Sequence, residues 1–327
     1  MLDHPELSEA PEPPSAATPV AGSAIKGAVR TSSRHDSAHK HVAGQAPYTD
    51  DIPAPAGCLH LALGLSDRPH AKIVSLDLAK VCAAPGVVAV FTAEDISGLN
   101  DASPGTGDDP LFAESVTVFH GQPLFAVAAA TRQAARRASR LAEVHYEELP
   151  AVLTIDEALA AKSFINGPKI MERGDPAPIL DKTRHRLQGK IEIGGQDHLY
   201  LEGQVSLAIP DEDGGVKVIS STQHPSEVQH NVAKVLALPN TAVTVEVRRM
   251  GGGFGGKETQ PAIFAAIAAL VATKTGKAAK IRLDRDDDMV ITGKRHDIRI
   301  DYDVAFDDDG RIEALDVVQA LRCGCST

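Results

Sequence analysis

Apolar and polar residues along the chain follow the two periods that distinguish strands from helices. Residues 59–65, 87–91 and 124–128 carry alternating or β-branched apolar side chains, which is typical of strands. A helical composition follows at 131–144, where Thr131 is a candidate N-cap. The first half of the chain is therefore predicted to be a small α+β block.

The second half mixes the same two kinds of element. Residues 261–274 are apolar with few helix breakers and predict a buried helix, and residues 225–236 predict another. A short helix is expected at 154–159. Strands are expected at 190–193, 205–209, 216–219, 241–249, 280–283, 298–304 and 312–321. Taken together, these elements predict the α+β class.

The composition suggests four regions. Residues 1–35 are rich in Pro, Ala, Ser and Glu, so we expect a disordered or loosely attached tail. Residues 36–150 form a first predicted domain, 151–189 a connector, and 190–327 a second domain. A length of 327 residues allows two domains.

The overall charge narrows the range of partners. The chain has 33 basic and 44 acidic residues, and its formal net charge of −11 argues against a nucleic-acid surface. The longest apolar run, 261–273, is too short to span a bilayer, and the acidic, Pro-rich start does not resemble a secretory signal. We therefore expect a cytoplasmic protein with neither a nucleic-acid nor a membrane partner.

Residue types that bind metals are present without a strong metal-binding pattern. The four cysteines show no C-x-x-C spacing, so structural zinc and iron–sulfur clusters are poorly supported. Aspartates at 284 and 286–288 could hold a divalent cation. Basic residues at 282, 285, 294 and 295 favour an ion-pair network there instead.

The strongest local signal is a glycine-rich loop at 251–258, between the predicted strand 241–249 and the predicted helix 261–274. Three interpretations follow from the glycines alone. The loop satisfies the dinucleotide pattern G-x-G-x-x-G, but it lacks the acidic residue expected about 20 positions later. It partly fits a P-loop, except that Glu258 stands where a magnesium-binding hydroxyl is needed. The third interpretation is a tight turn without a ligand.

Six segments in order make a more specific match. They resemble motifs of the xanthine dehydrogenase family of molybdenum hydroxylases, and the resemblance extends from about residue 37 to the end of the chain. The segments are 44–51, 121–123, 194–204 (GGQDHLYLEGQ), 221–229 (STQHPSEVQ), 248–258 (RRMGGGFGGKE) and 284–296.

The resemblance implies a fold and a set of partners. It implies an α/β hammerhead domain at 36–150, followed by the first part of a mixed α/β molybdopterin-binding domain at 190–327. Family members hydroxylate xanthine or hypoxanthine at a molybdenum-molybdopterin cofactor, using oxygen from water. Electrons then pass through iron–sulfur clusters to FAD and NAD. Because this chain has no cluster motif, the resemblance implies that the clusters and FAD lie on a partner subunit.

The resemblance also implies roles for individual residues. Glu258 would bind and orient a purine substrate, and Gln223 would contact an oxygen ligand of molybdenum. Gly253, Phe254 and Gly255 would contact the cofactor, with Phe254 near the metal. No residue of this chain would be catalytic, because the family's glutamate base is expected beyond residue 327. The chain is thus expected to be a truncated or split part of a molybdopterin subunit, inactive without the remainder.

Plainer roles remain open for the same residues. Glu258 could complement a helix dipole, Gln223 could cap the helix at 225, and Phe254 could be a core residue. Three other functions remain alternatives: an aldehyde or N-heterocycle hydroxylase subunit, a non-catalytic assembly remnant, and a nicotinamide-binding module.

Overall fold

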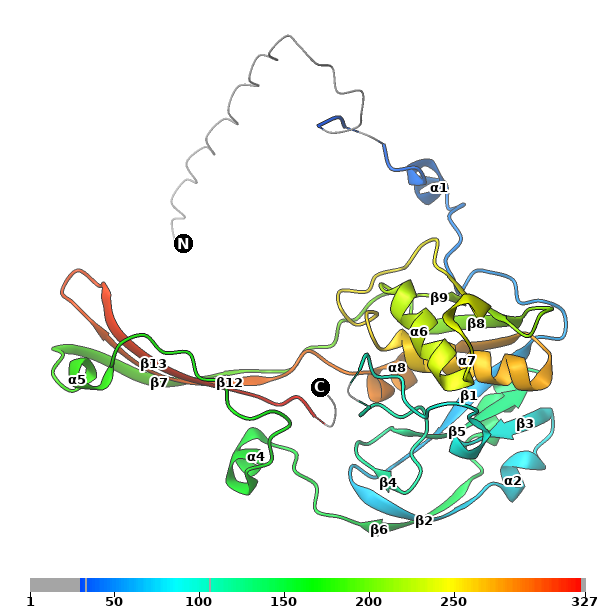
Figure 1. Ribbon diagram of the computed structural model, residues 1–327, viewed down its shortest axis with the longest axis horizontal. Helices are drawn as coiled ribbons and strands as arrows, with labels where there is room; N and C mark the ends of the chain where they lie inside the picture. The colour runs from blue at the N-terminus through cyan, green and yellow to red at the C-terminus, as the bar shows by residue number, and fades with distance from the viewer. Residues whose placement is uncertain (1–29, 33, 106, 325–327) are drawn as a thin grey trace, which may run out of the picture. The chain divides into compact units, whose positions relative to one another are not determined.

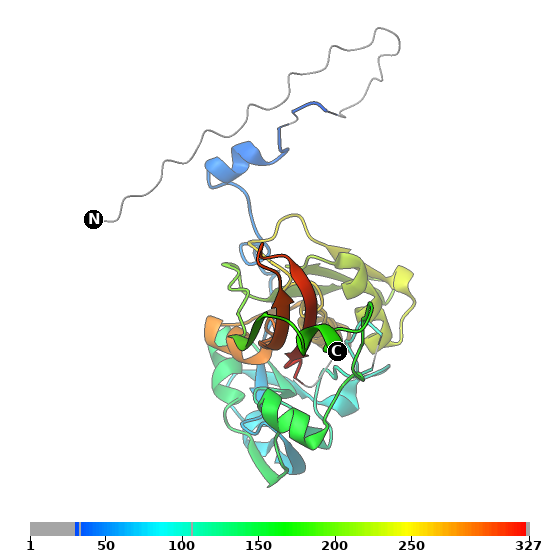
Figure 2. The same ribbon diagram turned by 90° about the vertical axis from the view of Figure 1, so that its left-hand side faces the viewer.

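The computed structural model, drawn in Figures 1 and 2, describes residues 30–32, 34–105 and 107–324. The chain divides into two units, Met1–Ala46 and Pro47–Thr327. In the first unit the described residues include a short helix, α1 (Ala38–Val42). Most of the predicted tail, residues 1–35, lies outside the described residues, so its disorder stays a prediction.

The centre of the second unit is a seven-stranded sheet. Its strands are β1 (Leu59–Leu65), β3 (Val87–Phe91), β5 (Pro123–Ala129), β8 (Val205–Pro210), β9 (Val216–Ser220), β10 (Val243–Glu246) and β11 (Ala279–Arg282). They run in the order β10-β9-β8-β11-β1-β5-β3. β1 and β11 pair in parallel, with Leu59 opposite Ala279, so one sheet takes strands from both predicted domains. The boundaries predicted near 150 and 190 remain a proposal.

Helices cover both faces of this sheet. α7 (Pro261–Thr275) lies on one face with α6 (Pro225–Leu236) beside it, as Figure 1 shows, and residues 261–272 of α7 are buried. α3 (Arg132–Ala138) packs on the other face. From Phe125 to Ala129, successive side chains of β5 alternate between the two clusters, because strand side chains point to opposite faces. None of the helices among the described residues has the length and apolar character needed to cross a membrane.

A small sheet extends the α3 side of the unit. It contains β2 (Ala71–Asp77), β4 (Val116–Thr117) and β6 (Glu143–Glu148), in the order β4-β2-β6. The helix predicted at 131–144 is therefore wrong in its second half. Thr131 does cap it, accepting from the Ala134 N–H at 3.2 Å, but the helix ends at Ala138. Residues 139–142 then form a turn and an irregular stretch, and pairing with β2 makes a strand of the residues from Glu143 onward, an effect of distant sequence that local composition does not show.

A third sheet projects away from the seven-stranded sheet. Its strands β7 (His185–Ile193), β12 (Ile298–Phe306) and β13 (Ile312–Leu321) run in the order β13-β12-β7. It extends to the left in Figure 1 and towards the viewer in Figure 2. Leu180 of α5 (Ala177–Leu180) packs on Ala305 and Ala314, while most side chains of β7 and β13 are exposed.

Short helical segments complete the unit. They are α2 (Ala79–Cys82), α4 (Ile155–Ala161), α8 (Arg285–Ile291) and two 3₁₀ turns at Ala93–Asp95 and Asn240–Ala242. α4 confirms the helix predicted at 154–159, and Thr154 and Glu157 form its capping box. α8 was not predicted, although its aspartates occupy the first turn, where they complement the helix dipole. The predicted α+β class is confirmed, since helices and mixed sheets are both present.

The loop before β4 contains a pH-sensitive carboxylate. Burial, together with Asp108 and Asp101, raises the pKa of Asp109 to about 6, against the opposing effect of Lys234. The folded-state pKa exceeds the ordinary value of 3.8, so this group lowers stability as pH rises from about 4 to 6. We expect Asp109→Asn to stabilise the protein at pH 7 by about 1–2 kcal/mol and to have little effect near pH 4. Urea midpoints at the two pH values measure this difference.

The control for this prediction is Asp213→Asn, which removes an exposed carboxylate from the turn between β8 and β9. It should change stability by no more than about 0.5 kcal/mol at either pH. An equal effect of Asp109→Asn at both pH values would contradict the raised pKa.

Candidate functional site

The glycine loop lies between β10 and α7 and exposes its phenylalanine. Phe254 adopts φ +55° and is 74% exposed, between Gly252 at φ +96° and Gly255 at φ +97°. A bulky residue in the left-handed region is strained, and such strain concentrates at functional sites. The interpretation of Phe254 as a core residue is therefore wrong.

Two of the glycines are required by close packing. A Cβ on Gly253 would lie 2.5 Å from Oε1 of Gln223, and one on Gly256 would lie 2.7 Å from the rings of His198 and Tyr200. Real Cβ atoms do not approach neighbours so closely, so any larger residue would displace the loop. The glycines that match the dinucleotide pattern have another use here. They allow Gln223 from one segment, and His198 and Tyr200 from another, to pack directly against the loop backbone.

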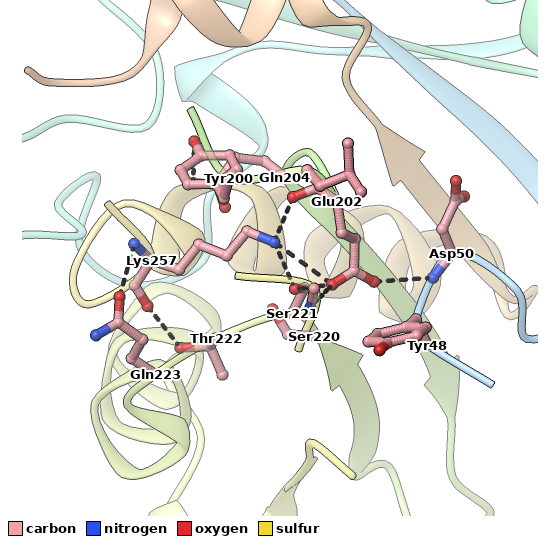
Figure 3. Close-up of polar contacts among 12 residues, drawn as sticks. Tyr48, Asp50, Tyr200, Glu202, Gln204, Ser220, Ser221, Thr222, Gln223 and Lys257 are labelled. Atoms are coloured by element: carbon pink, nitrogen blue, oxygen red, sulfur yellow. Dashed lines mark hydrogen bonds and ion pairs between the residues drawn. The ribbon is translucent and has the colours of Figure 1, made fainter. Parts of the chain in front are cut away.

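Gln223 holds the loop from the β9–α6 connection. Its Oε1 accepts a hydrogen bond from the Lys257 N–H at 3.3 Å (Figure 3) and another from the Gly255 N–H at 2.8 Å. Its backbone N–H donates to the Lys257 carbonyl at 2.7 Å. The N-cap position of α6 belongs to His224, so Gln223 is not the cap. Because the oxygen is committed to the loop, the side-chain amide nitrogen remains available; it has no hydrogen-bond partner among the residues that the structure describes.

Lys257 is fully buried and points away from the loop's outer surface. Its Nζ donates to the Glu202 carbonyl (2.6 Å) and Ser221 Oγ (2.7 Å), lies 3.5 Å from the Glu202 carboxylate and stacks on the Tyr200 ring at 4.7 Å. Burial lowers the pKa of Lys257, and Glu202 opposes that shift. A P-loop lysine must reach phosphates from the ligand side, so this geometry contradicts the P-loop interpretation.

Glu202 gathers three segments that are far apart in the sequence. Its Oε2 accepts from Ser221 Oγ at 2.6 Å and from the Gly251 N–H at 2.8 Å. Its Oε1 accepts from the Asp50 N–H at 3.3 Å, as Figure 3 shows. The carboxylate thus ties the start of the loop to a residue of the hammerhead region. Residues 196–202 belong to no strand and contain only an isolated bridge between Gln196 and Arg295.

A second buried carboxylate supports the same loop from α8. Asp288 is 2% exposed and accepts from the Tyr200 hydroxyl (2.6 Å) and the Gln204 N–H (2.9 Å). Gln204 in turn donates through Nε2 to the Gly256 carbonyl at 3.0 Å. Burial, and next Asp288 itself, raise the pKa of Tyr200, so the phenol remains a donor. The network fixes Tyr200 against Gly256.

Two of the clustered aspartates, Asp284 and Asp287, take part in ion pairs, but of the basic residues expected to pair with them only Arg282 does so. Asp284 pairs with Arg132 and Arg136 of α3, and lies 3.8 Å from Arg282. The two α3 arginines were not anticipated, because they lie about 150 positions away along the chain.

Glu258 follows the loop and is exposed. Its N–H donates to the Gly255 carbonyl at 3.3 Å, which keeps it next to the residues held by Gln223. α7 begins at Pro261 with Gln260 as its N-cap, so Glu258 precedes the first turn. The suggestion that it merely complements the helix dipole from that turn is wrong.

Sequence patterns did not identify the group of residues that holds the glycine loop in place. Glu202, Lys257, Asp288 and Asp50 form it. The sequence drew attention to Asp288 only as one of a run of aspartates, and to the other three only within the matched segments.

Comparisons with known proteins agree with this geometry. Residues 43–150 match the family described as "Aldehyde oxidase and xanthine dehydrogenase, a/b hammerhead domain", and residues 161–327 match "Molybdopterin cofactor-binding domain". Aldehyde oxidase 2 of Cavia porcellus is 44% identical over 293 residues, 89% of this chain and 22% of that protein. Xanthine dehydrogenase of Oryza sativa subsp. japonica is 42% identical over 287 residues, 86% of this chain and 21% of that protein.

Solved structures give the same result. Quinoline 2-oxidoreductase from Pseudomonas putida 86 superposes with a TM-score of 0.76 at 28% identity, covering 86% of this chain and 38% of that one. Aldehyde oxidoreductase from Desulfovibrio gigas gives 0.75 at 25% identity, covering 88% and 34%. The chain spans about a fifth of the length of the curated relatives. Both halves of the chain match in order. This chain therefore belongs to the aldehyde oxidase and xanthine dehydrogenase family of molybdenum hydroxylases.

Proposed function

We propose that this chain supplies the first part of the molybdopterin-binding subunit of a hydroxylase of the xanthine dehydrogenase type. The observation that carries the proposal is the Gln223 side chain, whose oxygen is held by two loop N–H groups while its nitrogen remains available. When bound, molybdenum-molybdopterin supplies the redox centre at which oxygen from water is transferred to a substrate carbon.

The residues of the loop fit such a group. An amide nitrogen donates without adding charge, which suits an oxygen atom bound to a metal. Gly255 leaves open space at the loop, since a Cβ added there would have His198 Nε2 as its nearest neighbour, at 3.7 Å. Phe254 offers an exposed apolar surface next to it. An acceptor-bearing group with a flat organic part can therefore lie against Phe254 and Gly255, whereas Gly253 is buried against Gln223.

In this proposal each side chain has a limited task. Gln223 donates its amide hydrogen to an oxygen at the metal and keeps the loop in place. Phe254 and Gly255 form the contact surface for the cofactor, and Gly253 lets Gln223 approach the loop from behind. Glu258 accepts or shares a ring N–H hydrogen bond with a purine such as xanthine or hypoxanthine.

Glu258 is the basis for preferring a purine substrate. The resemblance implies that relatives acting on aldehydes tend to carry an apolar residue at this position. The second candidate, an aldehyde or N-heterocycle hydroxylase, is favoured by the 44% identity to an aldehyde oxidase. In the first candidate Glu258 binds the purine substrate, whereas in the second candidate turnover does not depend on Glu258.

Replacing Glu258 by valine in the assembled enzyme distinguishes them. If Glu258 binds the purine, its loss removes a charge-assisted hydrogen bond, and kcat/KM for xanthine should fall by about ten- to a hundredfold. Steady-state kinetics with xanthine and with an aromatic aldehyde measure the effect. The matched control is Glu212→Val, which alters an exposed glutamate in the turn between β8 and β9. Unchanged turnover of xanthine by Glu258→Val would reject the purine assignment.

We further propose that the activity needs an iron–sulfur and FAD subunit and the remainder of the molybdopterin subunit, in the cytoplasm. The chain covers about a fifth of its relatives, and we assign it no catalytic base. The isolated chain should therefore not oxidise xanthine. A purified 327-residue chain that turned over xanthine unaided would overturn this.

A further inference from the structure

A second group of charged residues lies on the other side of Asp50 from the glycine loop. Figure 3 shows the Asp50 carboxylate pointing away from Glu202, to which only its N–H is bonded. Beyond that carboxylate is a cavity of about 210 Å³. Its lining is Asp50, Ala54, His60, Leu61, Arg132, Lys280 and Arg282. Three of these residues are cations and one is an anion.

The pairing of β1 with β11 brings the cations to one place. His60 lies directly opposite Lys280 in the parallel register, so both side chains point to the same face of the sheet. Arg282 lies two positions after Lys280 and shares that face. α3 covers the same face, and its first residue, Arg132, closes the cavity from above the sheet.

The carboxylates nearby do not neutralise these cations one for one. Asp50 accepts from Arg282 Nε at 2.5 Å, and its other oxygen is 3.8 Å from Lys280 Nζ. The hydrogen bonds of Lys280 go to neutral carbonyls, those of Asp50 (2.9 Å) and Ile52 (3.3 Å). Asp284 is shared among Arg132, Arg136 and, at 3.8 Å, Arg282. The cavity therefore keeps an excess of positive charge.

Burial and the nearby positive charges lower the pKa of two groups that line the cavity. Burial, followed by Lys280 and Arg132, lowers the pKa of His60. Burial, followed by Arg282 and Arg136, also lowers the pKa of Arg132, although Asp50 and Asp287 oppose this. In addition, Arg132 Nε is buried without a hydrogen-bond partner among the described residues. An anion placed among the three cations would favour the protonated forms of His60 and Arg132. It would also give Arg132 Nε a hydrogen-bond acceptor.

We propose that this cavity is a binding site for a small oxyanion of the phosphate or sulfate class, held by Lys280, Arg132 and Arg282. Size permits it, since about 10–15 Å³ is enough for one water and the cavity is many times larger. Tetrahedral oxyanions suit guanidinium groups, which donate in pairs, and an ammonium adds a point charge. The site is separate from the glycine loop and does not depend on the proposed activity.

The test titrates the full chain with inorganic phosphate, and in a second series with sulfate, at an ionic strength held constant with sodium chloride. The readouts are the NMR titration of the His60 imidazole, assigned with His60→Gln, and the thermal unfolding midpoint. We expect each oxyanion to raise both the pKa of His60 and the midpoint in a saturable way. Response to phosphate alone, or to sulfate alone, would identify which source the site accepts.

Variants connect the response to the cavity. Lys280→Met should weaken oxyanion binding by about tenfold or more, because a charged donor is lost. The control is Lys217→Met, which removes an exposed lysine of β9. If Lys280→Met does not fold, Arg132→Gln provides the same comparison. The proposal is overturned if neither oxyanion acts beyond chloride, or if both variants bind as tightly as the parent.

Discussion

Replacing Lys257 by methionine should destabilise the protein by about 3–5 kcal/mol. The substitution removes the donor to the Glu202 carbonyl and to Ser221, and it leaves the Glu202 carboxylate, 8% exposed, without its cation. A buried charge without a partner costs far more than the intact pair contributes. Urea unfolding followed by circular dichroism measures the loss.

A matched lysine tests whether the effect comes from burial. Lys217→Met breaks a surface pair with Glu246, where both side chains are about half exposed, and should cost under about 1 kcal/mol. Adding Glu202→Gln to Lys257→Met should restore part of the stability, because the unpaired charge is then gone. If Lys257→Met were as stable as Lys217→Met, the network would not support the loop as described.

The second large effect is expected at Gly256. In Gly256→Ala the new Cβ would lie 2.7 Å from the Tyr200 ring, which is 3% exposed and held by Asp288. Because Tyr200 cannot move aside, the loop must shift, at a cost of about 1–3 kcal/mol. The same shift would displace Gly255 from Gln223. We therefore expect lower thermal stability of the chain, and lower molybdenum content in an assembled enzyme that carries the substitution.

Gly167→Ala is the matched control for that substitution. No atom lies within 4 Å of its added Cβ, and its φ is not in the left-handed region. Its effect on stability should stay within about 0.5 kcal/mol, and molybdenum content should not change. A Gly256→Ala protein with the stability and metal content of the control would show that the loop tolerates the displacement.

Most individual elements could be predicted from local sequence, because strands and helices leave different hydrophobic periods. α6 and β13 have the predicted bounds, and α7 extends one residue beyond them. The failures share a cause. β2 and β6 are half-exposed strands with weak alternation, and each exists because it pairs with the other. The helix predicted at 131–144 overlaps β6 only at Glu143 and Val144, where pairing with β2 decided the structure.

The sequence predicted the exposed residues of the candidate site, but it did not predict which buried residues hold the glycine loop in place. Gln223, Phe254 and Glu258 lie in short motifs that can be recognised along the chain. Their mutual arrangement depends on Glu202, Lys257 and Asp288, which contact the loop from three other segments. Buried polar groups need partners, and those partners are chosen by proximity in space.

The sequence alone determined the order of elements, the glycine loop, and the resemblance that pointed to a molybdenum hydroxylase. These follow from local periodicity, from the conformational freedom of glycine, and from short motifs. Tertiary structure alone decided that one sheet joins the two regions through β1 and β11, that Lys257 faces inward, and that cations from α3 and β11 meet beside Asp50. Strand pairing and the burial of charge depend on residues up to about 230 positions apart, and no local pattern records which of them will meet.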